Sequence, residues 1–372
     1  MNFLIVMLLP FLIMIGAYVF FNKEYSLKEL SIQMAVQVGL IGIICLCVTH
    51  WDTYDTEILN GSIIRKEPIK VHCRHSYDCN CYSYPCGTSK HPSTCRHCDT
   101  CYEHAYDIDW MVYTNIGEEF EIESVDRQGL QEPPRWTAVY VGEPYATTHS
   151  YKDYIKGNPD SLFIKKGFKE KYNTFLPEYP GKIYDYYKIN RVIVQPGIFV
   201  KFDGWEEKLR EINSKLGPAK QCNVVIVVMN GMPEEAFYAL EEQWMGGKKN
   251  DVVVVMSVST NGIIKWVNVM ALTKNPMVKI KLRDELLYIR SIVSKDLVLD
   301  CIYKNVSECY KRQSMKEYAY LKANNVMTGA QLLVISIISL LLSIGLTIFF
   351  VMNDCGEFEW AENLNLPFRS RK

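Results

Sequence analysis

Three long apolar stretches interrupt an otherwise mixed sequence. They cover residues 3–21, 32–49 and 331–351, and none contains a charged side chain. At a rise of ~1.5 Å per residue, each is long enough to cross or nearly cross a hydrocarbon layer of ~30 Å. The pattern therefore predicts an integral, multi-pass membrane protein. Two helices would precede a large polar region, and one would follow it.

The first apolar stretch shares its hydrophobicity with secretory signal peptides. It is not preceded by a basic residue, and Gly16–Phe21 offers no small-residue cleavage site. We therefore expect a retained anchor that forms an antiparallel hairpin with the second stretch through residues 22–29. Gln33 and Gln37 lie one helical turn apart, so we expect both amides to face a neighbouring helix rather than lipid.

The remaining chain is globular in composition. Residues 50–328 have mixed charge and no low-complexity stretch, and they are too many for one small core. The predicted fold class is a membrane-anchored α+β protein. Its predicted parts are a transmembrane hairpin at 1–49 (helices 3–21 and 32–49), a Cys/His-rich zinc module at 50–110, a β-rich and wrapping segment at 111–190, an α/β sheet domain at 191–296, a helical stalk at 297–330, a transmembrane helix at 331–351 and a polar tail at 352–372.

Strand and helix patterns alternate after residue 190. The apolar, β-branched runs 222–229 and 252–258 are typical of strands covered on both sides. An alternation of strands and helices predicts an α/β sheet. The other predicted elements are strands at 191–194 and 263–272, helices at 204–217, 233–244 and 297–324, and, upstream, strands at 110–114 and 137–142 separated by a rigid bend at 132–136.

Cysteine and histidine gather between His72 and His104. Seven of the 13 cysteines and five of the seven histidines fall there. Repeated C-x2-C spacing lets two thiolates meet one tetrahedral ion at ~2.3 Å, which predicts structural zinc, about two ions per chain. The predicted ligands are Cys73, Cys79, Cys81, Cys86, Cys95, Cys98, Cys101 and His104, with His72, His75, His91 and His97 as alternative ligands.

Two other interpretations of this cluster remain open. A disulfide framework would suit an exported domain, but it leaves one of the seven cysteines over and does not explain the imidazoles. Reduced cysteines without ligands would not be expected to bunch in this way. Four protein ligands per zinc leave no open coordination position, so a structural role is favoured over a catalytic one.

The distribution of charged residues indicates which binding partners and which orientation in the membrane to expect. Residues 71–110 carry three basic and five acidic side chains, a poor match for nucleic acid. Basic residues near the membrane, among them Arg65, Lys66, Lys311 and Arg312, lie on the side of the large domain. The positive-inside rule therefore predicts that this domain is cytoplasmic, and reduced cysteines would agree with that placement.

The α/β region resembles the TPM domain. The resemblance rests on the strand Val224–Met229, the helix 233–244 and the corner Trp244-x-Gly246-x-Lys248-Lys249-Asn250 before Val252. It covers about 190–290 and implies a membrane-anchored α/β fold, with phosphatase activity proposed for some members. Asp251 stands where the family has glycine, and Lys265-Trp-Val-Asn-Val-Met replaces its glycine-rich stretch, so the fold carries over better than the activity. The whole chain also resembles uncharacterised membrane proteins of tailed bacteriophages, which implies no function.

Known catalytic motifs do not occur in the chain. It has no P-loop, Gly-x-Ser-x-Gly, His-Glu-x-x-His or Gly-x-Gly-x-x-Gly, and no small-molecule cofactor is evident. Apolar helices without charge offer no ion path, which disfavours transport. We expect a protein that binds or scaffolds an unknown protein partner at the lipid bilayer.

The alternative is a membrane-anchored, metal-dependent hydrolase of the phosphatase type that uses the TPM-like domain. Asn250 and Asp251 would then ligate a cation, although such a pair is more typical of a turn. Trp244 is expected to pack beneath that turn.

Overall fold

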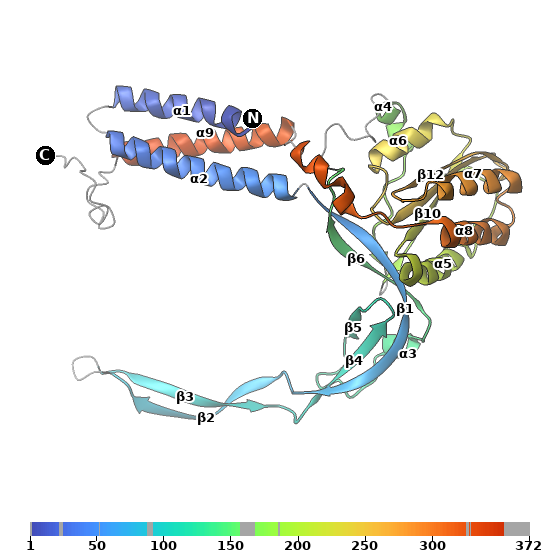
Figure 1. The fold of residues 1–372 in the computed structure, drawn as a ribbon. Coiled ribbons are helices and arrows are strands. Elements are labelled where there is room, and N and C mark those ends of the chain that lie inside the picture. The colour runs from blue at the N-terminus through green and yellow to red at the C-terminus, as the bar shows by residue number, and fades with distance from the viewer. Residues whose placement is uncertain are drawn as a thin grey trace. The chain divides into compact units, whose positions relative to one another are not determined.

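A computed structural model divides the chain into two compact units (Figure 1). One contains Met1–Asp55, Ser150–Ile164 and Ser314–Lys372, and the other contains Thr56–His149 and Lys165–Gln313. Within these units the structure describes residues 2–21, 25–51, 53–87, 92–156, 168–184, 187–324, 327 and 329–352.

The first unit is built on three apolar helices that lie side by side (Figure 1): α1 (Asn2–Phe20), α2 (Leu27–Trp51) and α9 (Gly329–Met352). The 3-10 helix η2 (Met315–Asn324) precedes α9. A capping box begins α2, because the backbone N–H of Ser26 donates to the Glu29 carboxylate (2.6 Å) and the Glu29 N–H donates to the Ser26 hydroxyl (3.3 Å). By length and composition α2 and α9 are able to cross a membrane, and α1 contains a shorter apolar helix, Leu4–Phe20.

The two glutamines of α2 bind α9. The Gln33 amide donates to the Ser343 carbonyl (2.9 Å) and the Thr347 hydroxyl (3.0 Å). The Gln37 amide donates to the Ser339 carbonyl (2.7 Å) and hydroxyl (2.9 Å). The prediction that these amides face a neighbouring helix is confirmed.

The outward faces of these helices are apolar. Phe20 of α1, Leu46 of α2 and Leu333 of α9 are 86%, 70% and 62% exposed. Exposed apolar side chains on all three helices are unfavourable in water and favourable in lipid. The packing of this unit therefore agrees with a membrane environment.

A four-stranded sheet opens the second unit, with the strand order β5-β4-β1-β6. A small core of Trp110, Val112, Ile122, Val139 and Tyr145 stabilises it. The predicted strand at 110–114 is confirmed, but the predicted zinc module at 50–110 contains a strand of this sheet that the sequence reading missed. The strands are β1 (Tyr54–Val71), β4 (Asp107–Thr114), β5 (Glu119–Ile122) and β6 (Pro144–Lys152).

The predicted strand at 137–142 is wrong. A short helix, α3 (Pro134–Ala138), occupies its beginning. Pro134 stands at the start of this helix, where its fixed φ is already helical, and the Thr137 N–H donates to the Pro133 carbonyl (3.0 Å). The proline pair that predicted a bend therefore begins a helical turn.

Between β1 and β4 the chain forms an antiparallel hairpin of β2 (Ser76–Pro85) and β3 (Thr94–Tyr102), here called the cysteine hairpin. Among the described strands β2 and β3 pair only with each other. No described position in either strand is buried. The hairpin therefore has no apolar core of its own.

The α/β sheet has the strand order β12-β11-β10-β9. β10 is parallel to β9 and β11, and β12 returns antiparallel to β11 after the turn at Gly262, whose φ of +81° suits glycine. The strands predicted at 191–194, 222–229, 252–258 and 263–272 are confirmed. Their bounds are β9 (Val192–Val194), β10 (Asn223–Asn230), β11 (Asp251–Val258) and β12 (Ile264–Ala271).

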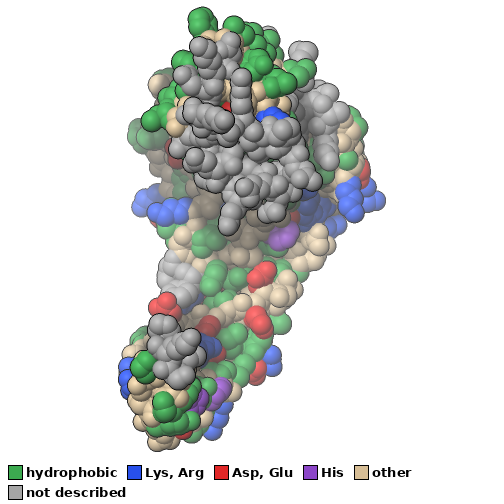
Figure 2. Space-filling model, turned by 90° about the vertical axis from the view of Figure 1, so that its left-hand side faces the viewer, with side chains coloured by type: hydrophobic (Ala, Val, Ile, Leu, Met, Phe, Trp, Pro, Cys, Tyr) green, Lys and Arg blue, Asp and Glu red, His purple; other side chains and the backbone are tan. Residues whose placement is uncertain are grey.

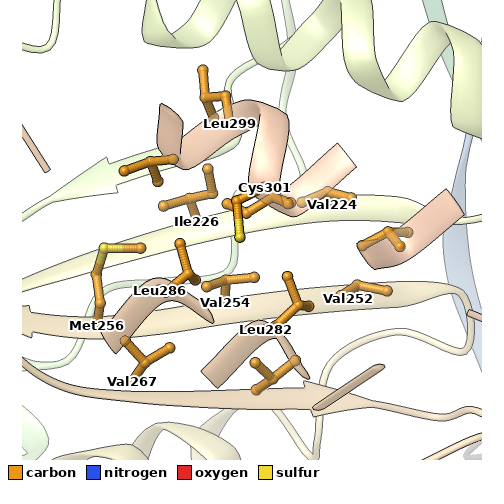
Figure 3. Packing of buried hydrophobic residues seen from close by; sticks show 14 of the residues in the cluster. Val224, Ile226, Val252, Val254, Met256, Val267, Leu282, Leu286, Leu299 and Cys301 are labelled. Atoms are coloured by element: carbon orange, nitrogen blue, oxygen red, sulfur yellow. The ribbon is translucent and has the colours of Figure 1, made fainter. Parts of the chain in front are cut away.

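Helices cover both faces of this sheet. Val224, Ile226 and Val254 point to one face, where Leu282 and Leu299 of the covering helices meet them (Figure 3). That face is covered by α5 (Trp205–Lys220), α7 (Met277–Ile289) and α8 (Lys295–Cys309). The opposite face packs against α4 (Phe168–Tyr172) and α6 (Glu235–Gln243). Alternation along each strand thus buries both sides, as expected for a sheet covered on two faces.

The long helix predicted at 297–324 is two separate elements. α8 ends at Cys309, where the Asn275 amide donates to the Cys309 carbonyl (3.0 Å) and Lys274 N–H donates to the Lys311 carbonyl (2.9 Å). The first of these bonds satisfies a carbonyl at the helix end. The remaining short elements are η1 (Asn173–Phe175), β7 (Ile183–Tyr184) and β8 (Lys188–Ile189).

Candidate functional site

The cysteine hairpin carries three disulfide bonds. Cys79 is bonded to Cys101, Cys81 to Cys98 and Cys86 to Cys95. Antiparallel pairing places these residues near one another across the two strands. The Cα atoms of the three pairs are 5.8, 4.0 and 5.6 Å apart, in the order named. The first and third distances lie within the range of about 4.4–6.8 Å that is usual for a disulfide, and the second lies just below it.

These bonds involve six of the eight predicted zinc ligands. A cysteine in a disulfide has no thiolate for a metal, so Cys79, Cys81, Cys86, Cys95, Cys98 and Cys101 do not form the two predicted four-ligand sites here. The signal that sequence reasoning missed is nesting, since the three pairs close around one turn with separations of 22, 17 and 9 residues. Nested pairs are expected of a hairpin, in which each residue meets one at the same distance from the turn.

Tyrosine side chains cover the cysteine hairpin. Tyr82 and His97 are opposite each other on the two strands, with ring centroids 5.4 Å apart, and Tyr84 lies 6.1 Å from Tyr82. Tyr82 is 58% exposed and Tyr77 is 52% exposed. Figure 2 shows the end of the hairpin at the bottom, where hydrophobic, polar, basic and histidine side chains intermingle. This surface is aromatic and polar rather than strongly charged.

The two other predicted ligands, Cys73 and His104, lie at the base of the hairpin. The Cys73 thiol is 3.7 Å from the His104 Nδ1 atom. Asp107, which the sequence reading did not select, completes a group whose ligand atoms all lie within 4.8 Å of one another. Of the alternative ligands, His72 packs against Tyr102 and His75 Nε2 is 3.0 Å from the Arg127 carbonyl, while His91 lies outside the described residues.

Asp251 is buried beneath the corner that suggested a hydrolase. Its Oδ1 accepts from the Asn223 amide (2.8 Å), and its Oδ2 accepts from the Tyr179 hydroxyl and the Lys248 N–H (both 2.8 Å). The neighbouring Asn250 amide donates to the Ile58 carbonyl of β1 (2.7 Å). Burial raises the pKa of the Asp251 carboxyl to about 6. Both oxygens are used in shaping the turn.

A buried arginine extends this network. Arg191 donates to the side chains of Asn223 and Asn60 and to the Ile189 carbonyl, and burial lowers the pKa of its guanidinium to about 10. Asn223 therefore separates the arginine from Asp251. Trp244 is buried, packs edge-to-face on Tyr179 and donates to the Pro177 carbonyl (3.0 Å).

A cleft of about 430 Å³ contains a second buried carboxylate that sequence reasoning missed. Its lining includes Glu57, His149 and Arg312. Glu57 accepts two hydrogen bonds of 2.7 Å from the Arg312 guanidinium, and Lys249 lies 3.6 Å away. Since both oxygens are held by arginine, this carboxylate ties β1 to the chain after α8.

No family model, curated protein or solved structure matches the chain. The resemblances to the TPM domain and to bacteriophage membrane proteins therefore stay predictions.

Proposed function

We propose that this chain is a multi-pass membrane protein that presents the cysteine hairpin to a protein partner. The observation that carries the proposal is a hairpin with three cross-strand disulfides, exposed tyrosines and no buried position among its described strand residues. A covalently braced strand pair loses little conformational entropy on binding. Tyrosine supplies a large contact area with few rotatable bonds, as it does in antibody loops.

The charge of the hairpin favours protein over nucleic acid as the partner. Within its described part, the formally charged side chains are Asp78, Arg96 and Asp99. Binding to phosphates depends on several lysines or arginines acting together. An aromatic, nearly neutral surface instead matches the composition of protein interfaces.

The membrane arrangement rests on all three apolar helices. α1 packs with α2 and α9 around Val6, Met7, Ile41 and Ile335. Amide contacts between α2 and α9 would be costly to break in hydrocarbon. These contacts support a three-span bundle, in which the N-terminus and the second unit share one side.

The disulfides favour an oxidising compartment for the second unit. This orientation is the reverse of the cytoplasmic one that the basic flanks predict. We give the disulfides more weight, because the positive-inside rule loses force for a domain of this length. Asp251 gives the hydrolase alternative no support, since both its oxygens are occupied.

Site-specific photocrosslinking in the full chain tests the binding function. A photoreactive aromatic residue replaces Tyr82 on the hairpin or, as a control, Tyr288 of α7, which is 88% exposed. We expect one discrete crosslinked protein from position 82 and none from position 288. Tyr84→Ala should weaken that crosslink by about tenfold, since interface tyrosines are often hot spots.

Three results would contradict the proposal. Equal crosslinking at both positions would indicate non-specific contact, and crosslinked nucleic acid would identify the wrong class of partner. No adduct at position 82 in cells that make the protein would remove the hairpin as the binding surface.

A further inference from the structure

The base of the cysteine hairpin is a gap between two strand ladders. The β1–β4 ladder ends at the pair Val71↔Asp107, and the β2–β3 ladder begins at Ser76↔Tyr102. Residues 72–75 and 103–106 lie between these pairs, where the Glu103 N–H donates to the His75 carbonyl (3.0 Å). The side chains at this gap decide how firmly the hairpin is fixed to the sheet.

The three potential ligands at the gap have the spacing of a metal site. The Cys73 thiol is 3.7 Å from His104 Nδ1, and His104 Nδ1 is 3.4 Å from Asp107 Oδ1. Bonds of ~2.0–2.3 Å in a tetrahedron place the ligand atoms of zinc roughly 3.3–3.8 Å apart. The Cys73 and Asp107 ligand atoms also lie within 4.8 Å of each other, so small side-chain movements would place all three atoms around one ion.

The Asp107 carboxylate is buried at the centre of this group. Asp107 is 6% exposed, and its Oδ2 accepts from the Arg74 backbone N–H (2.9 Å). Its buried Oδ1 makes no hydrogen bond of good geometry, and the group nearest to it is His104 Nδ1, at 3.4 Å. A cation bound between the two would satisfy this oxygen.

The same three residue types also form catalytic triads, but the geometry here is different. In a triad the nucleophile and the acid bind opposite nitrogens of the imidazole. Here the Cys73 sulfur and the Asp107 oxygen both approach Nδ1 of His104. Convergence on one point is the arrangement of ligands around an ion.

We propose that Cys73, His104 and Asp107 bind one zinc ion that fixes the cysteine hairpin to the β1–β4 ladder. Thiolate, imidazole and carboxylate together suit zinc and exclude magnesium or calcium, which prefer oxygen. On binding, Cys73 releases its thiol proton to solvent, and no oxidation or reduction occurs. Three protein ligands leave one coordination position to water, so this site is more open than the two four-ligand sites predicted from the sequence.

The site also accounts for the odd cysteine. Six of the seven cysteines between 73 and 101 are paired, and Cys73 is buried and free. A free thiol beside three disulfides is a potential nucleophile for exchange. Coordination by zinc would hold that sulfur away from the disulfides.

Metal analysis of the full chain in detergent, purified without reductant or chelator, tests the proposal. We expect about one zinc per chain in the wild type and in the control Cys309→Ser, whose cysteine is buried and free elsewhere in the second unit. Cys73→Ser should lower zinc affinity by about 10–100-fold or more, since even groups that only orient ligands have effects of that size. Cobalt in place of zinc should give a thiolate charge-transfer band that Cys73→Ser abolishes.

Disulfide mapping of each variant checks that it has folded, and Asp107→Asn provides a second test if Cys73→Ser fails that check. Less than stoichiometric zinc in the wild type would overturn the proposal. So would wild-type zinc affinity in correctly paired Cys73→Ser, or in Asp107→Asn where that variant serves as the test. Because the readout is metal content, its failure is distinct from failure of the partner-binding function.

Discussion

The cysteine hairpin and the α/β sheet belong to the same unit, but each is stabilised by a different kind of interaction. In the hairpin no described strand position is buried, and six cysteines are joined in disulfides. In the sheet every position of β11 is buried, and Cys222, Cys301 and Cys309 in the core against the sheet are free and buried. Where apolar burial supplies stability, cysteine behaves as a small hydrophobic side chain. Where apolar burial is absent, as in the cysteine hairpin, disulfide bonds supply the stability instead.

Reduction should have the largest effect, and it should be confined to the hairpin. Taken singly, a disulfide that closes a loop of 9, 17 or 22 residues contributes about 2.5–3.5 kcal/mol in the chain-entropy model, and nested loops contribute less than the sum. Amide hydrogen exchange with and without reductant should show loss of protection in β2 and β3. Protection in β10 and β11 should be unchanged. Loss of protection in all four strands together would contradict the claim that only the hairpin depends on its disulfides.

Shortening a buried side chain in the core of the α/β sheet should destabilise the sheet and leave the hairpin disulfides intact. Leu282 of α7 is fully buried against β-strand side chains, so Leu282→Ala should lower the free energy of unfolding by about 2–5 kcal/mol. The matched control is Leu297→Ala on α8, which is 61% exposed and should change it by about 0.5 kcal/mol or less. Urea unfolding monitors the sheet, and disulfide mapping should find the hairpin pairs intact. Equal effects of the two variants would show that burial does not control stability here.

The free energy of unfolding of the α/β sheet should depend on pH through the buried Asp251 carboxyl. The pKa of Asp251, about 6 in the fold, exceeds the value of ~3.9 in an unfolded chain. The folded state therefore retains a proton that the unfolded state releases, so the free energy of unfolding falls as pH rises from about 4 to 6, by roughly 2–3 kcal/mol. Burial also raises the pKa of Glu206, so Asp251→Asn should flatten the slope without removing it. An unchanged slope in this variant would show that Asp251 does not titrate as described.

The smallest effect should be alkylation of the sheet cysteines. Burial raises the pKa of the Cys222 thiol to about 12, which leaves almost no thiolate at neutral pH. Iodoacetamide should therefore leave Cys222 unmodified in the native protein and modify it fully in denaturant. Rapid native modification would mean that the sheet core opens readily.

The elements defined by strong hydrophobic patterns were predictable. The apolar runs that form β10 and β11 are rich in β-branched side chains, which are typical of a strand covered on both faces. Gln33 and Gln37 were also predictable, because an amide among apolar residues needs a partner.

Pairing between distant residues was not predictable in the same way. The C-x2-C spacing suits a metal and a hairpin equally, and only the register of β2 and β3 decides which cysteines meet. Asp107 was missed because its role depends on Cys73, which is brought near it by the end of the β1–β4 ladder. A lone acidic residue carries no such information in sequence.

The most direct test of this account is peptide mapping of the non-reduced full chain by mass spectrometry. We expect three linked pairs, Cys79–Cys101, Cys81–Cys98 and Cys86–Cys95, with Cys73 free. The contrary result is free thiols at all six positions together with about two zinc ions per chain. That outcome would restore the reduced zinc module and the cytoplasmic placement, and it would remove the braced hairpin on which the proposed function rests.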